Sequence, residues 1–313
     1  MPRRLALLAL LLPFSVLAAG CGSGSDKATD STSTNDENGS VTLTAPDWAA
    51  PLLRKQGPEG AAVMASSDFA VGENRISFLL IRNDNSTISA RTADVYYRPT
   101  ARGPTKKTVA QYVPIGAKAS NSDEVKAIYV AKVRLSRPGK QWIVIQPRGV
   151  AFQGFQILDV KDKPIAIAIG EKAPASRNPT LQTQSARQIT TARPPDKALL
   201  WYSVADSLKD RVPFVVAFAT PAYCQSRTCG PTVDVVDAVR KRFERQGVRF
   251  IHIEIYEDNL PGKGTNRWVN EWKLPTEPWV YVVDKQGIVR DRFEGAVSVG
   301  ELERSVQQHL LSR

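Results

Sequence analysis

Cysteine, histidine and long apolar stretches are all scarce in this chain of 313 residues. It has three cysteines and two histidines, so at most one disulfide can form within the chain. Beyond the N-terminus, no segment approaches the ~18 consecutive apolar residues that a membrane-spanning helix needs. A glycine-rich phosphate loop, a zinc-type ligand spacing and a serine, histidine and aspartate order are missing as well, which excludes nucleotide-dependent and hydrolytic classes of protein.

The start of the sequence is typical of a secretory signal. Two arginines precede an apolar stretch, residues 5–19, which is too short to cross a membrane comfortably and ends in small residues. Cys21 follows at once, and this segment resembles the bacterial lipobox, in which the new N-terminal cysteine is acylated. That motif usually has leucine three places before the cysteine, where this chain has Ala18. The sequence therefore predicts a signal peptide at residues 1–20 and lipidation of Cys21, with plain cleavage or an uncleaved anchor as alternatives.

Such an N-terminus predicts an extracytoplasmic protein, lipid-anchored to a membrane of the bacterial cell envelope, where disulfides are tolerated. Residues 21–45 are rich in Ser, Thr, Gly, Asn and Asp and nearly free of large apolar side chains, so they cannot form a packed core. We expect a flexible tether with a random-coil end-to-end distance of roughly 27 Å. Outside the cytoplasm, nucleic acid is not an expected partner.

The rest of the chain is longer than one hydrophobic core normally requires, which predicts two domains. Prolines alternate with Ser, Thr, Gln and Arg in residues 173–195, and this composition indicates a linker. The first domain is therefore placed at residues 46–172 and the second at residues 196–313.

The first domain is predicted to be an all-β, immunoglobulin-like sandwich. It contains short runs rich in Val, Ile, Tyr and Phe, which breakers such as Pro138-Gly139 separate. Residues 125–135 alternate polar and apolar side chains, as a half-exposed strand does. This domain has neither cysteine nor histidine, so a binding or spacer role is expected.

The second domain is predicted to alternate strands and helices in the order β-α-β-α-β-β-α. An apolar run at residues 212–219 indicates a buried strand and leads into a loop that carries Cys224 and Cys229. An amphipathic helix is expected to follow from Pro231, a residue that suits the first helical position. Because Cys21 is expected to carry the lipid, Cys224 and Cys229 are each other's natural disulfide partner.

The spacing of these two cysteines limits where they can lie. On one regular helix, positions five apart have Cα atoms roughly 8.6 Å from each other, whereas a disulfide tolerates up to about 7 Å. Cys224 must therefore lie in the loop before the helix if the pair closes. A cysteine at a helix N-terminus is typical of thiol-disulfide chemistry, because the helix end stabilises a thiolate.

The second domain resembles the thioredoxin-like family over residues 196–313. The resemblance lies in the cysteines that follow the first buried strand and in Thr276-Glu277-Pro278, which precedes another apolar strand. It implies that Pro278 is a cis proline facing the cysteines, with Glu277 as its neighbour. Within that family, the combination of a lipobox-like N-terminus and this domain is similar to that of membrane-tethered, extracytoplasmic thioredoxin-like lipoproteins. The family has two residues between its cysteines, whereas this chain has four.

Two alignments of the cysteine loop stay open because of this longer spacing. Residues 229–232, Cys-Gly-Pro-Thr, resemble the family's Cys-Gly-Pro-Cys and would make Cys229 the thiol at the helix start. Counting from the end of the strand instead favours Cys224, six residues after Phe218, as the attacking cysteine. We favour Cys224, which should be the more exposed of the two, with Cys229 as the resolving cysteine.

Three neighbours are expected to set the reactivity of the pair. The helix N-terminus and Arg227 should lower a thiol pKa, whereas Glu277, if it faces the pair, should raise it by like-charge repulsion. Glu277 can also relay a proton to a leaving thiolate, and the alternative for this residue is a solvent-facing side chain.

The resemblance implies a thiol-disulfide oxidoreductase that acts on thiols and disulfides of exported proteins, with an unknown redox partner and no dissociable cofactor. The main alternative is a non-catalytic binding scaffold in which the two cysteines form a structural disulfide. A copper-binding protein of the same fold is a further alternative, because copper(I) favours thiolates. His252 is predicted in a strand and His309 in the final helix, away from the place of the family's copper histidine, so no metal ligand is assigned.

Overall fold

The computed structural model describes residues 33–35, 41–43, 45–53, 60–100, 102–115, 125–152 and 154–312. The expected signal peptide, Cys21 and most of the expected tether lie outside these residues. The chain divides into two units after residue 44. In the first unit, β1 (Ser33–Asn35) pairs antiparallel with β2 (Val41–Leu43). No helix in the described ranges has the length and hydrophobicity to cross a membrane.

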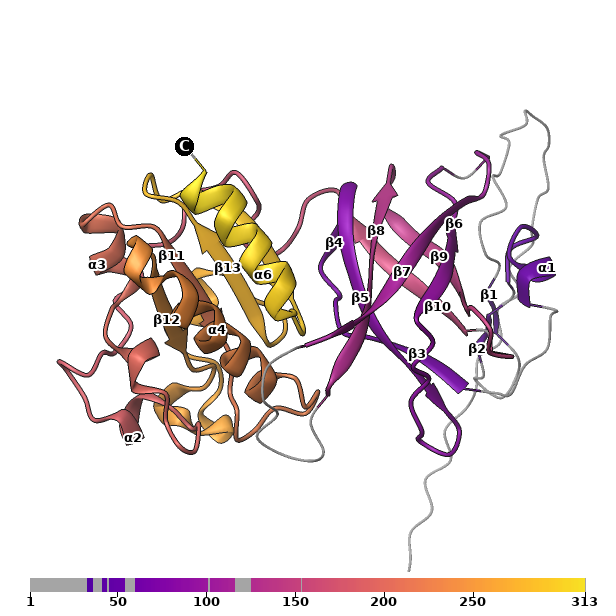
Figure 1. Ribbon diagram of the computed structural model, residues 1–313. Helices are drawn as coiled ribbons and strands as arrows, with labels where there is room; N and C mark the ends of the chain where they lie inside the picture. Colours follow the sequence, from indigo (N-terminus) through magenta and orange to yellow (C-terminus); the bar gives the residue numbers. More distant parts are fainter. Residues whose placement is uncertain are drawn as a thin grey trace, which may run out of the picture. The chain divides into compact units, whose positions relative to one another are not determined.

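The second unit is a mixed α/β structure with one large curled sheet and a second, four-stranded sheet (Figure 1). Among the described residues, the large sheet has eight strands in the order β3-β5-β8-β7-β6-β9-β10-β4. All neighbours pair antiparallel except β10 and β4, which are parallel. A short helix, α1 (Ala50–Leu53), precedes the sheet. The strands are β3 (Gly60–Met64), β4 (Phe69–Ala70), β5 (Gly72–Arg82), β6 (Thr92–Tyr97), β7 (Lys106–Pro114), β8 (Ala127–Leu135), β9 (Gly139–Pro147) and β10 (Gly154–Lys161).

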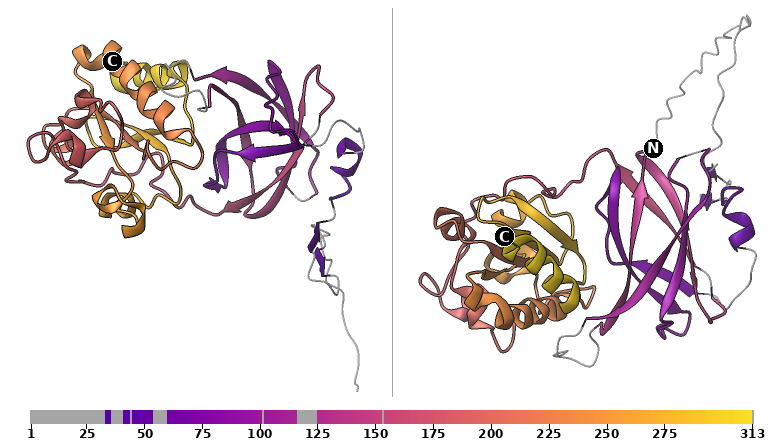
Figure 2. Two further views of the ribbon diagram at one scale, coloured as in Figure 1. Left: turned by 90° about the horizontal axis from the view of Figure 1, so that it is seen from below. Right: turned by 45° about the horizontal axis from the view of Figure 1, so that its top comes forward.

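The predicted β-rich character of this region is confirmed, but the predicted immunoglobulin-like sandwich is not what the strands form. β6 pairs with both β7 and β9, which joins into one sheet the strands that a sandwich would divide between two. The sheet curls instead (Figure 2), and the Gln156 side-chain amide in β10 donates a 2.5 Å hydrogen bond to the carbonyl of Ala62 in β3. The expected alternation in β8 is confirmed, since Tyr129, Ala131 and Val133 are buried while Lys132 and Arg134 are exposed.

The four-stranded sheet has the order β12-β11-β13-β14. β11 pairs parallel with β12 and antiparallel with β13, and β13 pairs antiparallel with β14. The predicted order of strands and helices is found here. The strands are β11 (Phe214–Phe218), β12 (Arg249–Ile253), β13 (Trp279–Val283) and β14 (Val289–Glu294). The helices are α2 (Ala186–Ile189), α3 (Val204–Lys209), α4 (Cys229–Phe243), α5 (Arg267–Glu271) and α6 (Val299–Val306). Short 3₁₀ turns span Lys197–Leu200, Glu244–Gln246, Glu257–Asn259 and Pro261–Lys263, and a π-helical turn spans Gln307–Leu311.

Both faces of the four-stranded sheet are covered, since every residue of β11 and β13 is buried. Val215 and Ala217 of β11 pack in a core with α4 and α6. Ile128 of β8 and Ile115, the residue after β7, join that core. The alternate residues of β11 pack on the other side with a set that includes Trp272. The cysteine loop is thus anchored at the end of a fully buried strand.

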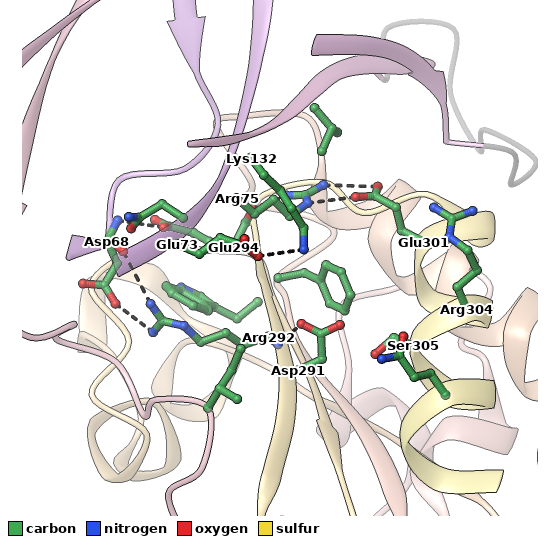
Figure 3. Close-up of a pocket in the computed structure, with 16 residues that line it drawn as sticks. Asp68, Glu73, Arg75, Lys132, Asp291, Arg292, Glu294, Glu301, Arg304 and Ser305 are labelled. Atoms are coloured by element: carbon green, nitrogen blue, oxygen red, sulfur yellow. Dashed lines mark hydrogen bonds and ion pairs between the residues drawn. The ribbon is translucent and has the colours of Figure 1, made fainter. Parts of the chain in front are cut away.

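Two ion pairs, Arg75 with Glu301 and Asp68 with Arg292, link the part of the chain that forms the large sheet to α6 and β14. Their residues line a pocket of about 310 Å³ (Figure 3). The Arg75 guanidinium donates to both carboxylate oxygens of Glu301, at 2.9 and 3.2 Å. Burial raises the pKa of Glu301, but the charge of Arg75 and the hydrogen bonds from Arg75 and Ser298 together outweigh it and hold that pKa below its usual range. Arg292 pairs with the buried Asp68 at 2.9 Å. These pairs are almost fully enclosed, so losing one partner should be costly.

We expect Arg75→Ala to lower the free energy of unfolding by about 2–3 kcal/mol, because Glu301 would keep its burial and lose its cation. Lys132→Ala is the matched control, since the ion pair of Lys132 with Glu73 is largely exposed and should change stability by less than about 0.5 kcal/mol. Urea unfolding of both variants measures the difference. Equal effects would contradict a structural role for the Arg75 pair.

Candidate functional site

Cys224 and Cys229 form a disulfide, and their Cα atoms are 5.9 Å apart. Cys229 is the first residue of α4, while Cys224 lies in the loop between β11 and that helix. The prediction from helix geometry that Cys224 precedes the helix is therefore confirmed. The helix was expected to begin at Pro231, but it begins two residues earlier. A proline is tolerated there, because the first N–H groups of a helix have no partner within it.

The loop that carries Cys224 is a series of tight turns. The N–H of Tyr223 donates to the carbonyl of Thr220 at 3.2 Å, and the N–H of Arg227 donates to the carbonyl of Cys224 at 3.4 Å. Arg227 has φ of +57°, a left-handed conformation that bends the chain back toward α4. Its side chain is exposed, and its carbonyl accepts the N–H of Val125 at 3.4 Å. The predicted effect of the Arg227 charge on a thiol stays a prediction.

The two sulfurs lie in different surroundings. Cys229 is fully buried, whereas Cys224 is half-buried. The Cys229 N–H, at the start of α4, donates to Cys224 Sγ at 3.2 Å, and Ser226 Oγ lies 3.3 Å from the same sulfur. Such donors favour negative charge on the Cys224 sulfur once the disulfide is reduced. Exposure and hydrogen bonding thus both favour Cys224 as the sulfur that meets a substrate.

Glu277 faces the disulfide. Its Oε2 lies 3.4 Å from Cys229 Sγ and accepts the N–H of Thr220 at 3.1 Å, while its Oε1 accepts the Tyr256 hydroxyl at 3.3 Å. Burial raises the pKa of Glu277 to about 7, even though the hydrogen bonds from Thr220 and Tyr256 act in the opposite direction. Glu254 adds a smaller like-charge effect that also raises this pKa. The carboxyl group therefore changes protonation state near neutral pH.

Pro278 lies next to this glutamate and directly before β13. The peptide bond between Glu277 and Pro278 is cis, as the resemblance implied, and Pro278 is buried. Its carbonyl accepts the N–H of Gly295 at 2.9 Å. A second cis peptide bond, between Arg193 and Pro194, was not predicted.

The sequence reasoning missed Thr220 and Tyr256, the two residues that hold the Glu277 carboxylate. A signal for both was present, because Thr220 directly follows the apolar run at residues 212–219 and Tyr256 is the last residue of a strand predicted at residues 248–256. β11 and β12 are parallel, so their carboxyl ends reach the same edge of the sheet. The residue before the antiparallel β13 is brought to that edge as well. The pairing of these strands, which the sequence does not state, was the missing information.

The two sulfurs and a Glu277 carboxylate oxygen lie within 4.8 Å of one another, but in this state the sulfurs are bonded to each other. Neither histidine joins them. His252 is buried in β12 with Nε2 at 2.9 Å from the carbonyl of Ala219, and His309 lies in the C-terminal π-helical turn. Copper binding stays a minor alternative without a histidine ligand in its favour.

A scan against protein-family models and a search of curated proteins both find no match for this chain. Inferences about its activity therefore depend on the residues and the geometry of the site.

In the reduced protein, we expect Cys224 to react with iodoacetamide at least about tenfold faster than Cys229, because exposure and thiolate character together set alkylation rates. A brief pulse followed by peptide mass spectrometry measures both sites. The denatured, reduced chain is the control and should label both cysteines at similar rates. Faster labelling of Cys229 in the folded protein would reverse the assignment.

Proposed function

We propose that this protein is a thiol-disulfide oxidoreductase of the thioredoxin-like class, held at the bacterial cell envelope by a lipid on Cys21 and acting on exported proteins. The observation that carries the proposal is the asymmetric disulfide at the start of α4, in which one sulfur is accessible and receives a helix N–H. The other sulfur is buried beside a carboxylate. This is the division of tasks that attack and resolution require.

The arrangement around the disulfide supports the thioredoxin-like assignment. The cysteine loop follows the parallel strand β11, the cis Pro278 precedes the antiparallel β13, and the hairpin of β13 and β14 leads to the final helix. α4 and α6 share one core against the sheet. These features follow the order that the sequence resemblance implied over residues 196–313.

The proposed reaction is an exchange of disulfides. The Cys224 thiolate attacks a substrate disulfide, a bond forms between Cys224 and one substrate sulfur, and the other substrate sulfur leaves as a thiolate that takes up a proton. The Cys229 sulfur, having lost its proton, attacks Cys224 Sγ and releases the second substrate sulfur, which is also protonated. Two electrons pass to the substrate, and the internal disulfide present here is formed. Run in reverse, the same steps oxidise a substrate dithiol.

A binding scaffold with a structural disulfide is the second candidate, and the full burial of Cys229 in the core favours it. The two candidates differ in reduction potential. A structural disulfide should have a reduction potential below about −300 mV, whereas a catalytic disulfide should have a higher potential and be easier to reduce. Equilibration of the protein with glutathione buffers distinguishes them.

We expect Cys229→Ser to accumulate mixed disulfides with exported proteins in cells, because the adduct on Cys224 could no longer be resolved. Cys224→Ser is the matched control and should accumulate few or none, since its remaining thiol is buried. Non-reducing gels with and without dithiothreitol reveal the adducts. If neither variant traps a partner, the oxidoreductase proposal fails and the scaffold is favoured.

A further inference from the structure

The pocket that the two ion pairs line lies apart from the cysteine pair. Its volume of about 310 Å³ is within the range of sites that bind small molecules. Neither cysteine nor Glu277 lines it, and its walls include parts of β5, β8, β14 and α6 (Figure 3). The proposed function leaves this pocket without a role.

Most charges in this pocket are already matched by a partner. Nine charged side chains line it, and six of them form three ion pairs: Arg75 with Glu301, Lys132 with Glu73, and Arg292 with Asp68. The carboxylate of Glu294 accepts hydrogen bonds from Ser67, Asp68 and Thr276. Arg304 is exposed, and its guanidinium lies near Gly300, one turn earlier in α6. The charge that remains to be explained is that of Asp291.

Asp291 lies in β14, and its carboxylate points into the pocket (Figure 3). Its Oδ1 accepts the N–H of Arg292 at 2.9 Å, and no ion pair of Asp291 is found in the described part of the chain. Burial raises the pKa of Asp291. The Ser305 hydroxyl and the Arg292 N–H act in the opposite direction, as do the charges of His309 and Arg75. Burial outweighs them, so the carboxylate lacks a cation that would offset its desolvation.

Ser305 faces the same part of the pocket from α6. It is only 4% exposed, and its Oγ has no hydrogen bond of normal geometry within the part of the chain that the structure describes. Buried hydroxyls are normally hydrogen-bonded, and one without a partner costs free energy. Gln308, three residues further on, brings a side-chain amide to the same wall. A polar ligand at this place would satisfy the Ser305 hydroxyl.

We propose that this pocket binds a primary alkylammonium group, with its nitrogen against Asp291, Ser305 and Gln308. An ammonium has three N–H donors and no acceptor, and these three side chains each offer an acceptor oxygen. The positive charge supplies the cation that the Asp291 carboxylate lacks. The methylene chain of the ligand lies against the apolar part of the lining, which includes Val130, Ile169 and Phe293.

A metal ion fits this site less well than an ammonium does. Within the described ranges, three side chains of metal-ligating type come close together at Cys224, Cys229 and Glu277, and not at this pocket. The lining includes the exposed side chains of Lys132 and Ile169, so the pocket opens to solvent. The amine can therefore belong to a small molecule or to a lysine side chain of a polypeptide, because both carry the same group.

The test is a calorimetric titration of the full chain, with its disulfide intact and in an amine-free buffer, with n-pentylamine. We expect saturable binding to a single site. Asp291→Asn should weaken this binding at least about tenfold, because it removes the charge and keeps the shape of the side chain. Ser305→Ala should weaken it about fivefold, because one hydrogen bond to the ammonium is lost. n-Pentanol, which has the same carbon chain without the charge, should not bind measurably.

A peptide with one lysine and blocked ends, acetyl-Gly-Lys-Gly-amide, distinguishes the two sources of the amine. Tighter binding of this peptide than of pentylamine assigns the pocket to a lysine side chain of a polypeptide. Weaker binding assigns it to a small molecule. The same peptide with an acetylated lysine is its control and should not bind, because acetylation removes the charge.

Asp159→Asn is the matched control variant. It changes the net charge by the same amount, but Asp159 is an exposed residue of β10 outside the pocket lining. The affinity for pentylamine should therefore stay within about twofold, because solvent and salt screen a distant exposed charge. Thermal unfolding of both variants without ligand checks that they fold. Asp291→Asn should be at least as stable as the unmodified chain, since it removes a buried charge without a cation.

Three results would overturn the proposal: no saturable binding of pentylamine, equal affinity in Asp291→Asn, or equal binding of pentanol. A lower stability of unliganded Asp291→Asn would also overturn it, because Asp291 would then already have its partner within the protein. These measurements do not involve the cysteine pair. The proposal therefore goes beyond the proposed function and is tested independently of it.

Discussion

The pairing of β11 with its two neighbours determines where every group of the site lies. β12 runs parallel to β11 and β13 runs antiparallel to it, so the chain after β11, the chain after β12 and the chain before β13 all meet at one edge of the sheet. Thr220, Tyr256 and Glu277 come together there, and α4 begins beside them. A shift of β13 by one residue would displace Glu277 by about 3.3 Å and separate it from the buried sulfur.

Features that depend on local sequence were predictable. The apolar run at residues 212–219 contains β11, and the distance limit on a disulfide placed Cys224 outside the helix. The capping pair of Ser298 and Glu301 marks the start of α6 and can be read from four consecutive residues. The resemblance, rather than local physics, carried the expectation of a cis bond before Pro278.

Features that depend on which strands pair were not predictable in the same way. The strands β5 to β10 of the large sheet were recognised, whereas the short β3 and β4 were not. The burial pattern of these strands is the same in two packed sheets and in one curled sheet. The pairing of β6 with β9 decides between these and joins residues about 50 positions apart in the chain. The contact between Glu277 and Cys229 likewise depends on three strands at once, so the sequence left the direction of this side chain open.

The hydrogen bond from the Val125 N–H to the carbonyl of Arg227 ties the chain just before β8 to the turn that carries Cys224. Val125 and Ile115 also pack with the core that contains Cys229. One flank of the cysteine loop is therefore occupied by the protein itself. If the pair acts on a polypeptide as proposed, that polypeptide has to reach Cys224 from a side other than the one that Val125 and Ile115 occupy.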